Sequence, residues 1–134
     1  MQTARLIGRR IIFIALLSSL LVAALAACEQ QTPAALQQEF HLLFNRIADE
    51  QERAGIERLA NETARFKERW SQSLGADNQE LARRAEILEV LLQSRADQLD
   101  AAALIHTDPQ SAAQLIQNAE QGLSRVSELL KQLE

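Results

Sequence analysis

The chain has 134 residues, with 14 basic and 18 acidic side chains and a formal net charge of −4. This length allows one small domain, and the acidic balance excludes the strongly basic surface of a typical nucleic-acid-binding protein. Ala, Leu, Gln, Glu and Arg dominate, whereas there are only four glycines, two prolines and no tyrosine; this composition favours helices over strands and predicts an all-α fold.

The first 28 residues have the charge and hydropathy pattern of an export signal. Three arginines among the first ten residues precede the uncharged run of residues 11–27. As a helix this run would cover roughly 25 Å, which is marginal for a bilayer core and equally fits the apolar region of a signal peptide. The run ends in the tetrapeptide LAAC, residues 25–28, and polar sequence follows it. Small side chains before the cysteine suit the narrow site of a protease.

This arrangement resembles the signal peptide of bacterial lipoproteins, with LAAC as the lipobox. The resemblance covers residues 1–28, and no family is recognised for the remainder. It implies cleavage before Cys28, attachment of diacylglycerol to the Cys28 thiol, and acylation of the new amino terminus with a fatty acid such as palmitate. The alternative is an uncleaved anchor helix in which Cys28 is incidental. Cys28 is the only cysteine, so an intrachain disulfide is excluded.

The residues after the lipobox predict where the lipidated protein goes. In the lipoproteins that this sequence resembles, Asp directly after the cysteine favours retention in the inner membrane, whereas here Glu29 and Gln30 follow. The resemblance therefore implies anchoring in the cell outer membrane, facing the periplasm, with the inner membrane as the alternative. Removal of residues 1–27 takes away three arginines and no acids, which leaves 11 basic and 18 acidic residues and a formal charge of −7.

After a short tether at residues 28–32, a first helix is predicted over residues 33–74. Thr32 suits the cap position and Pro33 the first helical position. From these residues to residue 74, large apolar side chains recur in the sequence at intervals typical of one face of a helix. Over residues 48–55 this stripe loses its large side chains, and Gly55 weakens a helix by about 1 kcal/mol relative to Ala. We expect a continuous but loosely packed helix there. The apolar stripe consists of Leu36, Phe40, Leu43, Ile47, Ile56, Leu59, Phe66 and Trp70.

Two further helices are predicted over residues 77–106 and 109–133. Gly75 can end the first helix in a left-handed conformation, and the sequence DNQE from residue 77 resembles a capping box. Asp108 and Pro109 repeat the cap-and-proline start. In the last helix apolar residues alternate at spacings of four and three, as in a coiled coil. That stripe comprises Ala112, Ile116, Ala119, Leu123, Val126, Leu130 and Leu133.

Short connections between helices favour antiparallel neighbours. The expected fold is therefore an antiparallel three-helix bundle, or helical hairpin, with coiled-coil-like packing over residues 33–134, after a cleaved signal peptide. In this arrangement the turn between the first and second helices is the end farthest from the membrane. The regular stripe of the last helix also predicts self-association.

No catalytic pattern is present in the sequence. Cys28 is consumed by lipidation, and neither a glycine-rich phosphate loop nor a zinc motif such as HExxH occurs. We therefore expect neither enzymatic activity nor a cofactor. The weak candidates for metal ligands are His41 and His106, which the predicted fold places at the same axial level near the membrane-proximal end. The alternative is that each histidine makes only local contacts.

Basic residues concentrate toward the predicted distal turn. Aromatic and arginine side chains dominate the hot spots of protein interfaces, so some of them are candidates for binding a partner. The alternative is a solvated surface of i,i+4 charge pairs, with the aromatic residues in the core. The candidate partner-binding residues are Arg65, Arg69, Trp70, Arg83 and Arg84.

Together these features predict a non-catalytic, lipid-anchored helical scaffold or adaptor in the periplasm. Its partner is expected to be a protein of a cell-envelope assembly, of the secretion, conjugation, efflux or pilus type. One alternative is a module that binds a lipid or another apolar ligand around residues 87–92. Another is a metal-responsive envelope protein that uses His41 and His106. The expected contacts are with the membrane through Cys28, with an envelope protein and with a second copy of the chain, and not with nucleic acid.

Overall fold

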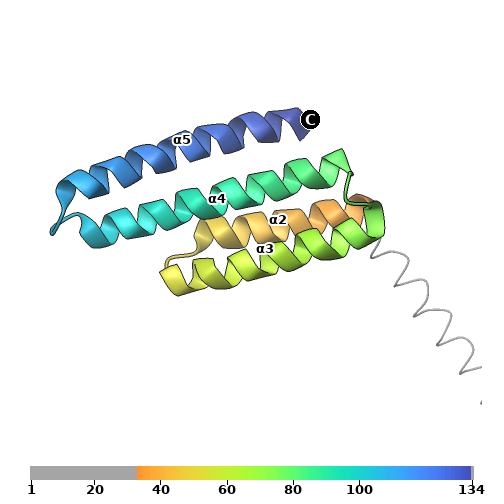
Figure 1. Cartoon of the computed structure of the whole chain (residues 1–134), viewed down its shortest axis with the longest axis horizontal. Coiled ribbons are helices and arrows are strands. Elements are labelled where there is room, and N and C mark those ends of the chain that lie inside the picture. Colours follow the sequence, from red (N-terminus) through yellow and green to blue (C-terminus); the bar gives the residue numbers. More distant parts are fainter. Residues whose placement is uncertain (1–32, 134) are drawn as a thin grey trace, which may run out of the picture. The chain divides into compact units, whose positions relative to one another are not determined.

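The computed structural model describes residues 33–133, which form four helices and no strands (Figure 1). The prediction of an all-helical fold is confirmed for this part of the chain. The signal peptide, Cys28 and the tether lie outside the described residues. The helices are α2 (Pro33–Asp49), α3 (Arg53–Leu74), α4 (Gln79–Leu104) and α5 (Pro109–Leu133).

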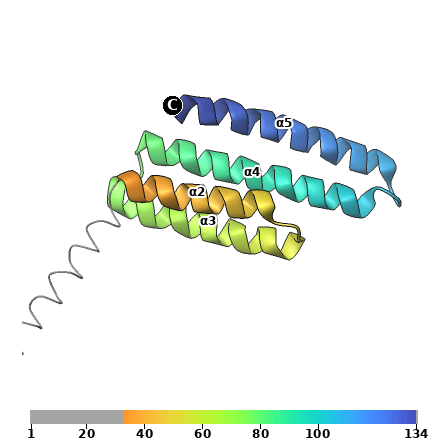
Figure 2. The same cartoon turned by 180° about the vertical axis from the view of Figure 1, so that it is seen from behind.

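The single helix predicted over residues 33–74 is wrong, because the chain forms two helices there. Residues 50–52 are not helical, and α3 runs back antiparallel to α2 (Figures 1 and 2). The apolar stripe continued across the break because both helices bury their large side chains. Four helices therefore replace the expected three, and the direction of every later helix relative to the first is reversed.

Contacts around Glu50 explain where the chain turns. The Glu50 N–H donates to Ile47 O at 3.3 Å and closes the end of α2, while the Glu50 carboxylate accepts the Glu52 N–H at 3.2 Å. This carboxylate lies over the buried Gly55, and a Cβ at Gly55 would overlap it. From α4, the Arg95 guanidinium donates two bonds to Glu50 O, at 3.0 and 2.6 Å. The glycine thus provides space for the turn, and Arg95 provides the partner for its carbonyl.

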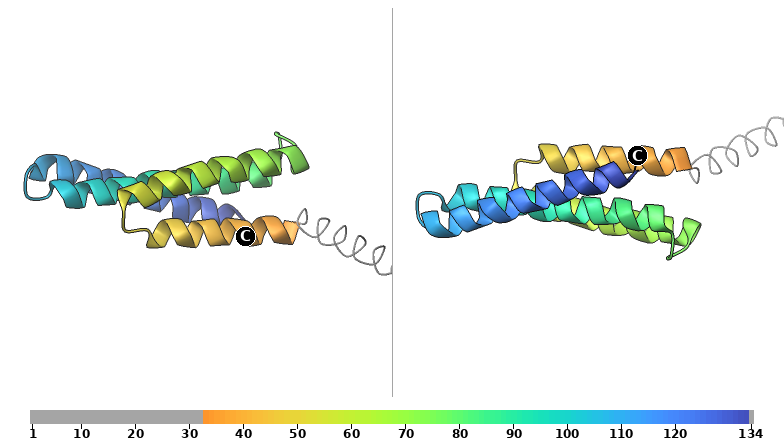
Figure 3. Two further views of the ribbon diagram at one scale, coloured as in Figure 1. Left: turned by 90° about the horizontal axis from the view of Figure 1, so that it is seen from below. Right: turned by 90° about the horizontal axis from the view of Figure 1, so that it is seen from above.

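By its contacts the chain divides into residues 1–37 and residues 38–134. In the second unit, described to residue 133, successive helices alternate in direction. The turn between α3 and α4 lies at the same end as the C-terminal end of α5 (Figures 1 and 2). The turn between α4 and α5 lies at the opposite end, and these two helices extend beyond the connection between α2 and α3 (Figure 3).

The large buried side chains of this unit come mainly from α2, α3 and α4. Each such burial contributes roughly 1.5–3 kcal/mol before the entropy of folding is counted. On α4 the buried residues extend around much of the helix, as expected for a helix covered on two sides. The large apolar core residues include Phe40, Leu43, Ile47, Ile56, Leu59, Phe66, Trp70, Leu81, Ile87, Leu88 and Leu91.

The contact between α4 and α5 includes small residues along the first half of α5, and Val126 and Leu129 are buried farther along the helix. Ala112 and Ala119 of α5 are each 1% exposed, and a Cβ at Gly122 would overlap Ser94 Oγ and lie 3.2 Å from Ser94 Cβ. Ser94 turns its hydroxyl toward its own helix and donates to Val90 O at 2.9 Å. Because no large side chain separates them here, the two backbones approach closely.

Glycine and short polar side chains form the ends of the helices. Gly75 closes α3 with φ 94° and donates its N–H to Ser71 O, so the predicted positive φ is confirmed. The cap of α4 is Asn78 and not Asp77, since Asn78 Oδ1 accepts the Leu81 N–H at 2.9 Å. Asp108 caps α5 as predicted: its carboxylate accepts the Ser111 N–H at 3.1 Å and the Ser111 hydroxyl at 2.6 Å.

Candidate functional site

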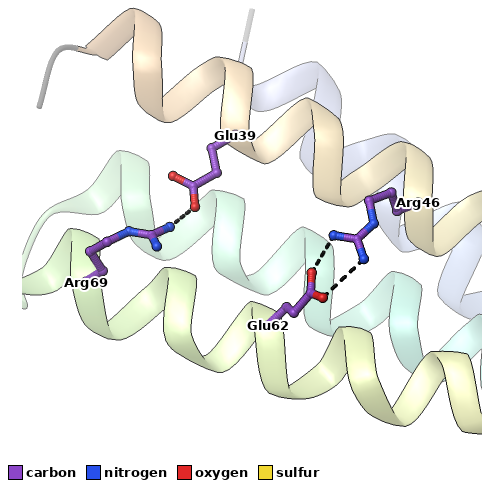
Figure 4. Close-up of polar contacts among 4 residues, drawn as sticks. All are labelled: Glu39, Arg46, Glu62 and Arg69. Atoms are coloured by element: carbon purple, nitrogen blue, oxygen red, sulfur yellow. Dashed lines mark hydrogen bonds and ion pairs between the residues drawn. The ribbon is translucent and has the colours of Figure 1, made fainter. Parts of the chain in front are cut away.

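Glu39 of α2 makes two polar contacts with the C-terminal half of α3. One carboxylate oxygen accepts the Trp70 Nε1–H at 2.8 Å, and the other forms an ion pair with Arg69 (Figure 4). Trp70 is only 3% exposed, so its indole packs in the core while its N–H reaches the polar edge. A buried indole usually has such a partner. Glu39 therefore joins α2 to α3 through both an aromatic and a basic side chain.

A second pair joins the same two helices farther along. The Arg46 guanidinium donates two bonds to the Glu62 carboxylate, at 2.5 and 3.1 Å (Figure 4). The hydrogen bond to Glu62 raises the pKa of Arg46 above its ordinary value. Both side chains are largely exposed, so the pair contributes at most about 1 kcal/mol to stability. The pair mainly affects how α2 and α3 are aligned, because two parallel hydrogen bonds favour one register of α2 on α3.

Arg84 is a cation buried at the contact between α2 and α4. Its guanidinium carbon lies 5.1 Å from the centre of the Phe40 ring, a cation–π distance. One terminal nitrogen donates to Glu80 Oε1 at 3.0 Å, whereas the buried Nε has no hydrogen-bond partner among the described residues. Arg84 therefore stabilises the position of Phe40 at the cost of incomplete hydrogen bonding.

The structure separates the five candidate partner-binding residues into two groups. Trp70 and Arg84 are buried and Arg69 is paired with Glu39, so these three serve contacts within the domain. Arg65 of α3 and Arg83 of α4 are exposed. The prediction of a partner-binding surface remains a prediction, and it rests on Arg65 and Arg83. The sequence did not distinguish the groups because all five residues share the same basic or aromatic character.

The expected juxtaposition of His41 and His106 is wrong. Both histidines are exposed, but α2 runs parallel to α4, and the neighbour of His41, Phe40, lies at the level of Arg84. His106 follows Arg84 by 22 residues, which separates the histidines by about 33 Å along the bundle. Residues 33–133 contain no group of three or more His, Cys, Asp or Glu side chains placed to hold a metal ion.

The predicted coiled-coil stripe of α5 is divided between two environments. Ala112, Ala119 and Val126 are buried, whereas Ile116 is 42% exposed and Leu123 38% exposed. The reason is that α4 covers the side of the stripe that carries Leu115, Gly122 and Leu129, and the opposite side remains uncovered. In the sequence, those three residues beside the heptad stripe already indicated that the buried face of α5 is shifted toward their side.

The polar surface of α5 forms a shallow depression beside this stripe. All of its lining side chains come from α5, so the depression follows the groove between successive turns of one helix. Hydrogen-bonding groups line it, and it does not include residues 87–92, so the apolar-ligand alternative stays a prediction. Its lining consists of Gln117, Glu120, Gln121, Ser124, Arg125 and Glu128.

Comparison with known proteins gave no relatives: no family model, no curated protein and no solved structure matches the chain. Within residues 33–133, no helix combines the length and the apolar character needed to cross a membrane. The polar contacts of the described residues include ion pairs, helix caps, one cation–π contact and hydrogen bonds to backbone carbonyls.

Proposed function

We propose that the protein is a non-catalytic, lipid-anchored helical scaffold or adaptor of the periplasm. A lipid on Cys28 would hold it in the outer membrane, and its helical domain would bind a protein of an envelope assembly of the secretion, conjugation, efflux or pilus type. The observation that carries the proposal is the tetrapeptide LAAC at residues 25–28, after an uncharged run and before polar sequence.

The described domain offers two surfaces that suit such a role. Arg65 near the middle of α3 and Arg83 in the first turns of α4 are exposed, and arginine is enriched in the hot spots of interfaces. On α5, Ile116 and Leu123 leave an apolar strip uncovered. These exposed arginines and apolar side chains support the proposal of an adaptor.

The anchor is tested by the intact mass of the full-length gene product purified from membranes. The expected mass lacks residues 1–27 and includes a diacylglycerol and an amide-linked fatty acid on Cys28. The matched control is Cys28→Ala, which should leave the signal segment attached and the mass unmodified. Separation of inner and outer membranes on a density gradient then locates the protein. An unmodified Cys28 thiol in a chain that still carries residues 1–27 would overturn the proposal.

The partner is tested by affinity isolation from detergent-solubilised membranes. A double substitution Arg65→Glu and Arg83→Glu should reduce recovery of the partner at least fivefold. Arg58→Glu is the control, since Arg58 is also exposed on α3 but lies farther from the α3–α4 turn. If no protein is recovered reproducibly with the wild-type chain, the adaptor role is wrong. Equal recovery with all variants would instead remove the arginine surface from the proposal.

A further inference from the structure

We draw no further inference here: the strongest candidate, the partly exposed row of Ile116, Leu123 and Leu130 on helix α5, carries none, because charged side chains lie along the same stretch of the helix and nothing in the structure shows what covers the row.

Discussion

Arg84 shows how a single charged residue is accommodated in the core of a small domain. Its guanidinium stacks over the Phe40 ring at 5.1 Å and donates to Glu80, but its Nε is buried without a partner. Removing a cation from water costs several kcal/mol, and incomplete pairing does not recover this cost. Replacement by an uncharged side chain of similar length should therefore be tolerated.

We predict that Arg84→Met leaves the free energy of unfolding unchanged or raises it by about 1–2 kcal/mol, because methionine fills the same space without a charge to desolvate. In contrast, Arg84→Ala should lower it by about 2–3 kcal/mol, since it leaves a cavity beside Phe40. Urea unfolding monitored by circular dichroism measures both. A loss of more than 1 kcal/mol in Arg84→Met would show that the charge itself stabilises the contact between α2 and α4.

Folding of α5 lowers the pKa of the Asp108 carboxyl. Hydrogen bonds from Ser111 lower the pKa of Asp108 below its usual value. A lowered pKa in the folded state stabilises the protein at pH values above the unfolded pKa, and this contribution disappears as the pH falls through the folded pKa. We predict that Asp108→Ala lowers the melting temperature at pH 7, and that the difference from wild type shrinks below pH ~4. Melting curves between pH 2.5 and pH 7 measure this; a difference independent of pH would contradict it.

The packing of helix α4 against helix α5 depends on the absence of a side chain at Gly122. A Cβ there would overlap Ser94 Oγ, so Gly122→Ala forces Ser94 to move and offsets the gain of about 1 kcal/mol in helix propensity. We predict that the change in the free energy of unfolding caused by Gly122→Ala is more stabilising, by at least about 1 kcal/mol, in a Ser94→Ala background than in the wild type. Unfolding of the four proteins in this double-mutant cycle measures the coupling, and additive effects would argue against a close approach.

The connection between α2 and α3 depends on Arg95 of α4. The Arg95 guanidinium donates two hydrogen bonds to Glu50 O, and a third to Gln98. Hydrogen bonds from a charged donor contribute about 1.5–3 kcal/mol, so Arg95→Ala should open the connection locally. We predict that trypsin then cuts after Arg53 at least tenfold faster than in the wild type. Arg83→Ala, at an exposed position on the same helix, is the control. Unchanged cleavage would show that the turn forms without Arg95.

These elements also show what the sequence was able to predict. Helix α5 has strong local signals, with Asp108 and Pro109 at its start and a regular apolar stripe along it. The break between α2 and α3 has only weak ones: the apolar stripe loses its large side chains over residues 48–55, which include Gly55, but residues 50–52 are glutamate and glutamine, which favour helices. That break depends on Arg95, a residue 45 positions away. In the candidate site, burial of Trp70 agrees with its place in the apolar stripe. Burial of Arg84 depends on Phe40 of α2, a contact that local patterns do not contain.

For the whole molecule, the change from three helices to four reverses the prediction of which end is distal. In the unit of residues 38–134, α5 ends beside the turn between α3 and α4, whereas the turn between α4 and α5 lies at the opposite end (Figure 1). With three helices, the turn around Gly75 was expected to be farthest from the membrane. With four, the turn between α4 and α5 takes that position in the proposed lipid-anchored protein, and the arginines at positions 65 and 83 lie nearer the bilayer.

This orientation gives a prediction that depends on the proposed anchor. Residues 28–32 span at most about 18 Å when extended, so a lipid on Cys28 would keep the start of α2 near the bilayer. A fluorophore at Gln132 should therefore transfer energy to acceptor-labelled lipid headgroups more efficiently than one at Thr107, because Thr107 lies about 37 Å farther along the bundle than Gln132. The two positions are compared within the same lipidated protein, so each serves as the control for the other. Equal transfer from Gln132 and Thr107 in the lipidated protein would show that the bundle lies flat on the membrane. Stronger transfer from Thr107 would show that the α4–α5 turn, and not the end of α5, lies nearer the bilayer.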